Sequence, residues 1–142
     1  MKKESVNLEL LKREMEKLLE VQPKLTDNGL YFIPTGYKIT IKPEKMLSDE
    51  ILKQFSLCRE WLSKVDKIET FNTNQGSYSY KHMVEGCFRR YVCNGAFIAA
   101  AISLGIPIQR CRLNNPSVYL KISQESVNEM IKYTNYDRNV ID

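Results

Sequence analysis

A single histidine and a nearby glutamate are the residues whose types and spacing best suit chemistry. His82 and Glu85 lie three residues apart in a segment with helical periodicity, which places an imidazole beside a carboxylate. Such a pair can form half of a metal site or act as an acid and a base. Lys81 and Arg89 each lie one helical turn from Glu85, however, and should keep its pKa low. We therefore expect an exposed structural ion pair or a recognition element, with no catalytic residue, metal or cofactor.

The four cysteines offer no alternative chemistry. They are Cys58, Cys87, Cys93 and Cys111, with no CxxC pair among them. A cysteine nucleophile needs a base within hydrogen-bond reach. Cys87 falls about 140° around a helix from His82, and Cys93 would have no second histidine to orient its base. No phosphate loop, dinucleotide fingerprint, nucleophile elbow or HExxH motif occurs either, so we expect reduced core thiols.

The positive charge is concentrated in one segment. The net charge of +4 equals the excess over residues 81–112, where Glu85 is the only acid. The basic residues there are Lys81, Arg89, Arg90, Arg110 and Arg112. A clustered basic surface suits nucleic acid, with Tyr78 or Tyr80 as a stacking surface. A helix-turn-helix reader is disfavoured, because the apolar segment 95–104 offers almost no polar side chains to base edges.

Apolar spacing predicts the helices that position these residues. A first helix places Leu8, Leu11, Met15 and Leu18 on one face and ends before Pro23. A second begins after Ser48 as its N-cap, with apolar residues at steps of four and three and with Trp61 in the core. They are Ile51, Phe55, Cys58, Leu62 and Val65.

The charged segment itself should form two helices. Ser77 can cap the first, in which Tyr80, Val84, Cys87 and Tyr91 share a face and Lys81, Glu85 and Arg89 form a ladder of ion pairs on the other. Asn94 should cap the second, which runs from 95 to 104 and ends at Gly105. This helix is apolar on every side, so we expect it at the centre of the fold.

Strand patterns fill the intervals. We expect one hairpin around Pro34 to Gly36 and another joining 108–113 to 118–123. The polar stretch 69–77 predicts a mobile loop, and a closing helix after Ser123 should fray over 136–142. The expected fold is therefore a single α+β domain over 1–142, predominantly helical, with about five helices around the buried apolar helix and two short hairpins.

The first twenty residues carry charges every few positions, and no apolar run reaches membrane-spanning length. With unpaired cysteines, this predicts a soluble protein of a reducing cytoplasm, with no membrane partner.

One segment resembles a known group of proteins. Ser77 and Tyr78, then Lys81-His82, Glu85, Tyr91, Asn94-Gly95 and Ile98 to Ala101 are similar to a stretch in small uncharacterised proteins of phages, plasmids and other mobile elements. The resemblance covers about 30 residues and implies a genetic setting rather than an activity. Proteins in that setting often act as accessory or counter-defence factors that bind a host protein.

Three hypotheses follow. The first is a non-enzymatic binding protein that docks on a host protein or complex, one form being an inhibitor of a host defence complex. Its expected binding face consists of Tyr78, Lys81, His82, Glu85, Arg89, Arg90, Arg110 and Arg112. The second is a nucleic-acid-binding protein that uses the basic surface of residues 81–112. The third is a small enzyme with His82 and Glu85 as acid and base, which requires a cleft beside them.

Overall fold

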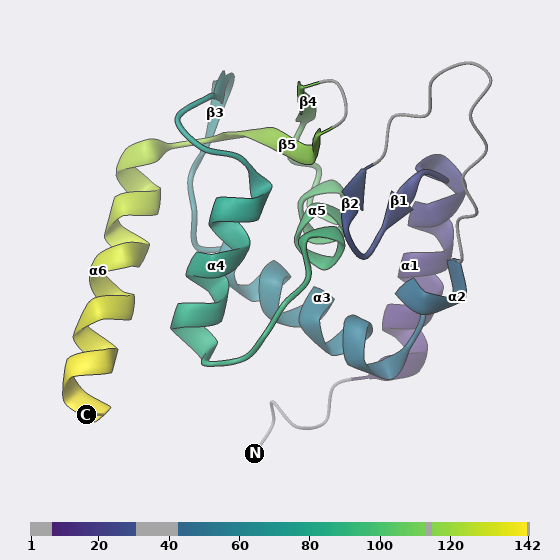
Figure 1. Ribbon diagram of the computed structural model, residues 1–142, viewed down its shortest axis with the longest axis horizontal. Helices are drawn as coiled ribbons and strands as arrows, with labels where there is room; N and C mark the ends of the chain where they lie inside the picture. The colour runs from purple at the N-terminus through teal and green to yellow at the C-terminus, as the bar shows by residue number, and fades with distance from the viewer. Residues whose placement is uncertain (1–6, 31–42, 113–114, 142) are drawn as a thin grey trace.

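The computed structural model describes residues 7–30, 43–112 and 115–141. Helix α5 (Asn94–Ser103) lies at the centre of the fold, with α1 (Leu8–Val21), α3 (Asp49–Leu62) and α4 (Ser77–Phe88) packed around it (Figure 1). Every residue of α5 from Asn94 to Ala101 is buried. A helix that is apolar all round has no face to offer water, so the prediction of a buried central helix is confirmed.

Helices α1 and α3 follow their apolar stripes. The Ser48 side chain accepts a hydrogen bond from the backbone N–H of Ile51 and begins α3, as predicted. Phe55, Cys58 and Trp61 on α3 are fully buried. A short helix, α2 (Pro43–Met46), precedes α3 and was not predicted.

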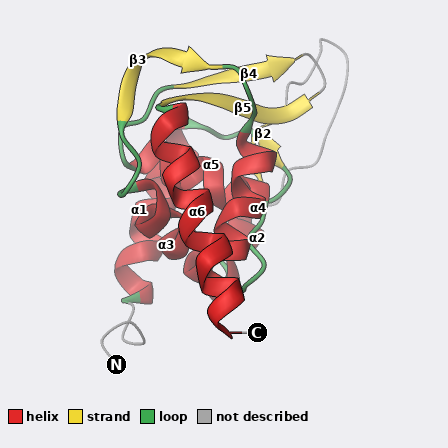
Figure 2. Ribbon diagram, turned by 90° about the vertical axis from the view of Figure 1, so that its left-hand side faces the viewer, coloured by secondary structure: helices red, strands yellow, loops and turns green. Residues whose placement is uncertain are grey.

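A three-stranded antiparallel sheet covers one end of the helices, as Figure 2 shows. Its order is β3 (Lys67–Asn72), β5 (Asn115–Ile122), β4 (Ile108–Arg112). Strands β4 and β5 form the predicted second hairpin. Val118, Leu120 and Ile122 are fully buried, in keeping with the alternation of apolar and polar residues along β5.

The prediction of a long loop over 69–77 is wrong in its secondary structure. Residues 69–72 belong to β3, 73–76 form the connection, and Ser77 is already the first residue of α4. β3 pairs with β5, which lies some fifty residues later in the chain: the Asn72 side chain donates to the Ile122 carbonyl, 50 residues away. Local polarity could not reveal that partner.

A short hairpin precedes the one expected around Pro34 to Gly36. The segment around Pro34 to Gly36 lies outside the described residues. The described hairpin pairs β1 (Leu25–Thr26) with β2 (Gly29–Leu30) across the turn at Asp27 and Asn28. Gly29 has a φ of 135°, which only glycine adopts readily.

The N-terminus of α5 joins this hairpin to the sheet. The Asn94 side-chain amide donates to the Asn28 carbonyl (2.9 Å) and to the Ser117 hydroxyl (3.3 Å). The predicted cap by Asn94 is therefore wrong: Cys93 is the N-cap, and its Sγ accepts from the Ala96 N–H. The Gly95 N–H donates to the Asp27 carbonyl, and a Cβ on Gly95 would lie 1.8 Å from the Thr26 carbonyl oxygen. Asn94 and Gly95 thus serve a backbone junction.

Helix α6 (Gln124–Ile141) closes the fold along α4. The Ser123 hydroxyl accepts from the Ser126 N–H at its start, as predicted. The helix continues through 136–141, where fraying was expected. The fold is a single α+β domain, as predicted, with six helices in the described part of the chain. Among the described residues, no helix is long and apolar enough to cross a membrane.

Candidate functional site

Four of the predicted site residues lie along one helix. Tyr78, Lys81, His82 and Glu85 follow each other on α4 at steps of three, one and three, so their side chains share one side of the helix. The helix begins at Ser77 beside β5, where the Ser77 hydroxyl accepts from the buried Val118 N–H. Ser77 therefore anchors α4 to the sheet rather than capping it, and Gly76 is the N-cap.

Of the four residues, Lys81 has the most extensive contacts with its neighbours. The residue is only 4% exposed, and its Nζ lies 2.9 Å from Oε2 of Glu85. The ammonium also lies 5.2 Å from the ring centroid of Tyr78 and 4.6 Å from that of Tyr91. Cation–π contacts of this kind gain strength as water is excluded. The predicted pair with Glu85 is present, but Lys81 is buried between two rings instead of standing on a solvated stripe.

The Glu85 carboxylate accepts hydrogen bonds from three donors. Burial by itself would raise the pKa of Glu85, but hydrogen bonds from Lys81, from His82 and from the Val92 N–H outweigh it and lower the pKa. The carboxylate therefore stays ionised at neutral pH. This agrees with the expectation that Glu85 is an ion-pair partner.

His82 occupies the open side of the same cluster. Its Nδ1 lies 2.8 Å from Oε1 of Glu85, its side chain is 52% exposed, and its ring meets that of Tyr78 edge to face at 4.7 Å. An ionised carboxylate only accepts hydrogen bonds, so Nδ1 carries the hydrogen. In the neutral ring, Nε2 is then an acceptor.

A hollow of about 350 Å³, which we call the α4 hollow, lies beside these side chains. Tyr78, Lys81, His82 and Glu85 form one side. Its other lining residues come from the β1–β2 turn and from the link between α4 and α5: Asp27, Asn28, Tyr91 and Asn94. Residues from the two ends of the segment between Tyr78 and Asn94 therefore line one site.

Tyr91 is the lining residue that helical periodicity misplaced. It was expected on the buried face with Tyr80 and Val84, yet it is 65% exposed. Helix α4 ends at Phe88 because Arg89 adopts a left-handed conformation with φ of 57°. This reversal carries Tyr91 back over Lys81. Arginine is an uncommon residue in that conformation, so no local signal marked the end of the helix.

The structure does not bring the predicted basic residues together. Arg89 and Arg90 are exposed at the link after α4, whereas β4, which carries Arg110, lies at the opposite end of the molecule (Figure 1). Arg110 donates to the Leu30 carbonyl, and burial lowers the pKa of its guanidinium. Arg112 is the last residue of β4. The continuous basic face expected from residue counts is therefore split, and Tyr80, expected as a stacking surface, is fully buried.

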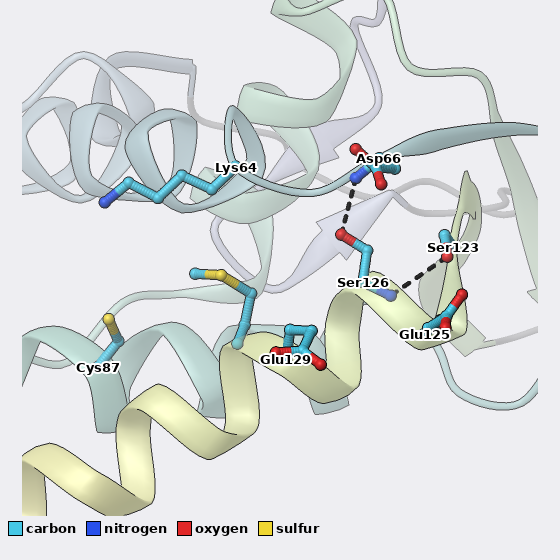
Figure 3. Close-up of a pocket in the computed structure, with 8 residues that line it drawn as sticks. Lys64, Asp66, Cys87, Ser123, Glu125, Ser126 and Glu129 are labelled. Carbon is cyan, nitrogen blue, oxygen red and sulfur yellow. Dashed lines mark hydrogen bonds between the residues drawn. The ribbon is translucent and has the colours of Figure 1, made fainter.

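A larger hollow of about 730 Å³ opens between α4 and α6 (Figure 3). Cys87 lies on one wall, and Glu125 and Glu129 on another. Its serine hydroxyls have structural roles: Ser126 accepts from the Asp66 N–H, and Ser123 accepts from the Ser126 N–H. None of the predicted site residues lines it.

All four cysteines are thiols; Cys58 and Cys93 are buried in the core, as expected, whereas Cys87 and Cys111 are half-buried. Burial raises the pKa of Cys58 strongly and raises that of Cys93 as well, which disfavours the nucleophilic thiolate. Among the described residues, no three His, Cys, Asp or Glu side chains are grouped so as to hold a metal ion. What the α4 hollow offers is a paired imidazole and carboxylate, a held ammonium and two aromatic faces.

Comparison of the chain with family models, curated proteins and solved structures finds no match.

Proposed function

We propose that this chain is a non-enzymatic binding protein that docks on a partner protein through the α4 hollow. The observation that carries the proposal is the pair of exposed tyrosines, Tyr78 (56% exposed) and Tyr91 (65%), on either side of the held Lys81. Aromatic side chains that are exposed and already ordered are typical anchors of protein interfaces, because little side-chain freedom is lost on binding.

The partner we propose is a host protein. The resemblance to proteins of phages and plasmids supports this setting, and an inhibitor of a host defence complex is the form to test first. Nucleic acid is less well supported, because Lys81 is paired with Glu85 and the arginines lie at opposite ends of the molecule.

Affinity capture from host lysate, with and without nuclease, tests the proposal. We expect a partner that survives nuclease and whose affinity falls about tenfold or more in Tyr78→Ala and in Tyr91→Ala. Tyr119→Ala, on β5, removes a half-buried ring from the sheet and should leave capture unchanged. A partner lost with nuclease would instead support nucleic acid. Capture that is unchanged in both hollow variants would contradict the proposal.

A second candidate is the third hypothesis, a small enzyme with His82 and Glu85 as acid and base. The specific observation in its favour is the hollow beside His82, which supplies the cleft that this reading requires. His82→Gln is the discriminating variant, because the exposed ring can be replaced without opening the core. If the wild type has an activity that His82→Gln loses while partner capture is retained, the enzyme is favoured. If the wild type has no activity and His82→Gln loses partner capture, the docking role is favoured.

A further inference from the structure

Strand β3 has an open edge, and none of its residues lines the α4 hollow. It is an outer strand of the sheet (Figure 2), and apart from β5 no helix or strand among the described elements makes more than marginal contact with it. Lys67, Ile68, Glu69 and Thr70 are exposed in succession, so neither face of this part of the strand is covered. Ile68 is one of the exposed large apolar side chains, at 39%.

The backbone just before β3 sets the direction of its hydrogen-bonding groups. The Asp66 carbonyl accepts from the Ser123 N–H, and the Asp66 N–H donates to the Ser126 hydroxyl, so both groups face β5 and α6. Successive residues of a strand direct these groups to opposite sides. The N–H and C=O groups of Lys67 therefore face the open edge, and the pairing proposed below extends the same alternation to Glu69. The register irregularity with β5 falls between Lys67 and Asn72 and leaves the middle of β3 outside the regular ladder.

The order of side chains on this edge is complementary to itself. If a second β3 approaches antiparallel and centred on Ile68, then Lys67 lies opposite Glu69 of the second copy, Glu69 lies opposite Lys67, and Ile68 lies opposite Ile68. Opposite charges directly across an antiparallel pair stabilise it, whereas like charges destabilise it. Among the described residues, neither Lys67 nor Glu69 forms an ion pair within its own chain.

We propose that β3 pairs antiparallel with β3 of a second copy of this chain, which joins two three-stranded sheets into one six-stranded sheet. Lys67 and Glu69 form the hydrogen-bonded pairs, and the two Ile68 side chains meet between them. The pairing follows two-fold symmetry, the commonest arrangement of homodimers. Because only a short segment is buried, the dimer is weak and forms as concentration rises.

Charge reversal at the edge gives a sharp test by sedimentation velocity over a concentration series reaching the millimolar range. The wild-type chain is expected to shift from monomer to dimer. Lys67→Glu places like charges opposite each other twice, and the dimer should weaken by roughly tenfold or more. The double variant Lys67→Glu with Glu69→Lys restores opposite charges and should restore the dimer. Lys53→Glu, at an exposed site on α3, is the matched control and should dimerise like the wild type.

Three results would overturn the proposal: a wild-type chain that stays monomeric throughout, a Lys67→Glu variant that dimerises like the wild type, or a double variant that fails to recover. Circular dichroism confirms that each variant is folded. Slowed amide exchange at Lys67 and Glu69 at high concentration is the further expected result, because their N–H groups face the second copy.

Discussion

Lys81 is a charged side chain in a buried position, and the carboxylate of Glu85 balances its charge. Such a pair gains little if both members are present, but removing one member leaves the other buried and unsatisfied. Glu85 also accepts hydrogen bonds from His82 and from the Val92 N–H, so it connects helix α4 to the link that carries Tyr91. The carboxylate therefore orders the hollow as well as neutralising the lysine.

Glu85→Gln should destabilise the fold by about 2 kcal/mol at pH 7, because Lys81 loses a charged acceptor. The pKa of Glu85 is lowered from its ordinary value of 4.5, so the ionised carboxylate stabilises the native state above that pH and this stability is lost as pH falls through the native pKa. Urea unfolding at several pH values measures the difference.

The wild type and Glu85→Gln should converge on acidification. Glu129→Gln removes a carboxylate from an exposed pair with Lys132, and it should change stability little at any pH. If Glu85→Gln matched Glu129→Gln at pH 7, Glu85 would not be holding Lys81.

At the scale of elements, the junction between the β1–β2 hairpin and α5 depends on Gly95. A Cβ there would lie 1.8 Å from the Thr26 carbonyl oxygen, which is backbone and cannot rotate away. Gly95→Ala should therefore cost about 3 kcal/mol or more, a loss typical of overpacked cores. The midpoint of chemical unfolding measures it.

Gly105→Ala is the matched control at the other end of α5. A Cβ at Gly105 would meet nothing within 4 Å, so only its φ of 76° opposes the change. That strain should cost about 1 kcal/mol. A Gly95→Ala loss no larger than this would mean that the hairpin can move away from α5.

The elements that the sequence predicts well are those with local signals. Ser48, the stripe on α3, the apolar α5 and the β4–β5 hairpin are all encoded within a few residues of where they act. β3 was missed because its pairing with β5 is non-local. Cys93 is the cap instead of Asn94 because the Asn94 amide is hydrogen-bonded to Asn28 and Ser117. Neither contact can be predicted from the spacing of residues in the sequence.

The features of the candidate site also divide into those that local spacing predicts and those that depend on distant contacts. The side-by-side placement of Lys81, His82 and Glu85 follows from helical spacing and was predicted. The burial of Lys81 and the return of Tyr91 depend on the chain reversal at Arg89, and the approach of Asp27 depends on the hairpin junction. Summing charge over residues 81–112 also misled, because residues in one stretch of sequence lie at opposite ends of the fold.

At the scale of the whole molecule, Cys58 can report on global opening. It is fully buried on α3, and burial raises the pKa of its thiol well above the ordinary value, so the native state should protect it from alkylation. Cys87 and Cys111 are half-buried and should react first. Maleimide labelling followed by mass spectrometry measures each site.

Labelling of Cys58 should rise with urea concentration in step with global unfolding. In Gly95→Ala it should rise at a lower urea concentration than in the wild type. Rapid labelling of Cys58 under native conditions, at the rate of Cys87, would show that α3 opens on its own.

The Asn94 amide has a consequence for synthesis of the chain. It bonds to Asn28, 66 residues before it, and to Ser117, 23 residues after it. During translation the hairpin with Asn28 leaves the ribosome long before Asn94 and Ser117 are made, and α1 emerges before α3 and α5 can cover it. We therefore expect the nascent chain to stay open until β5 is made, with folding completed in one late step.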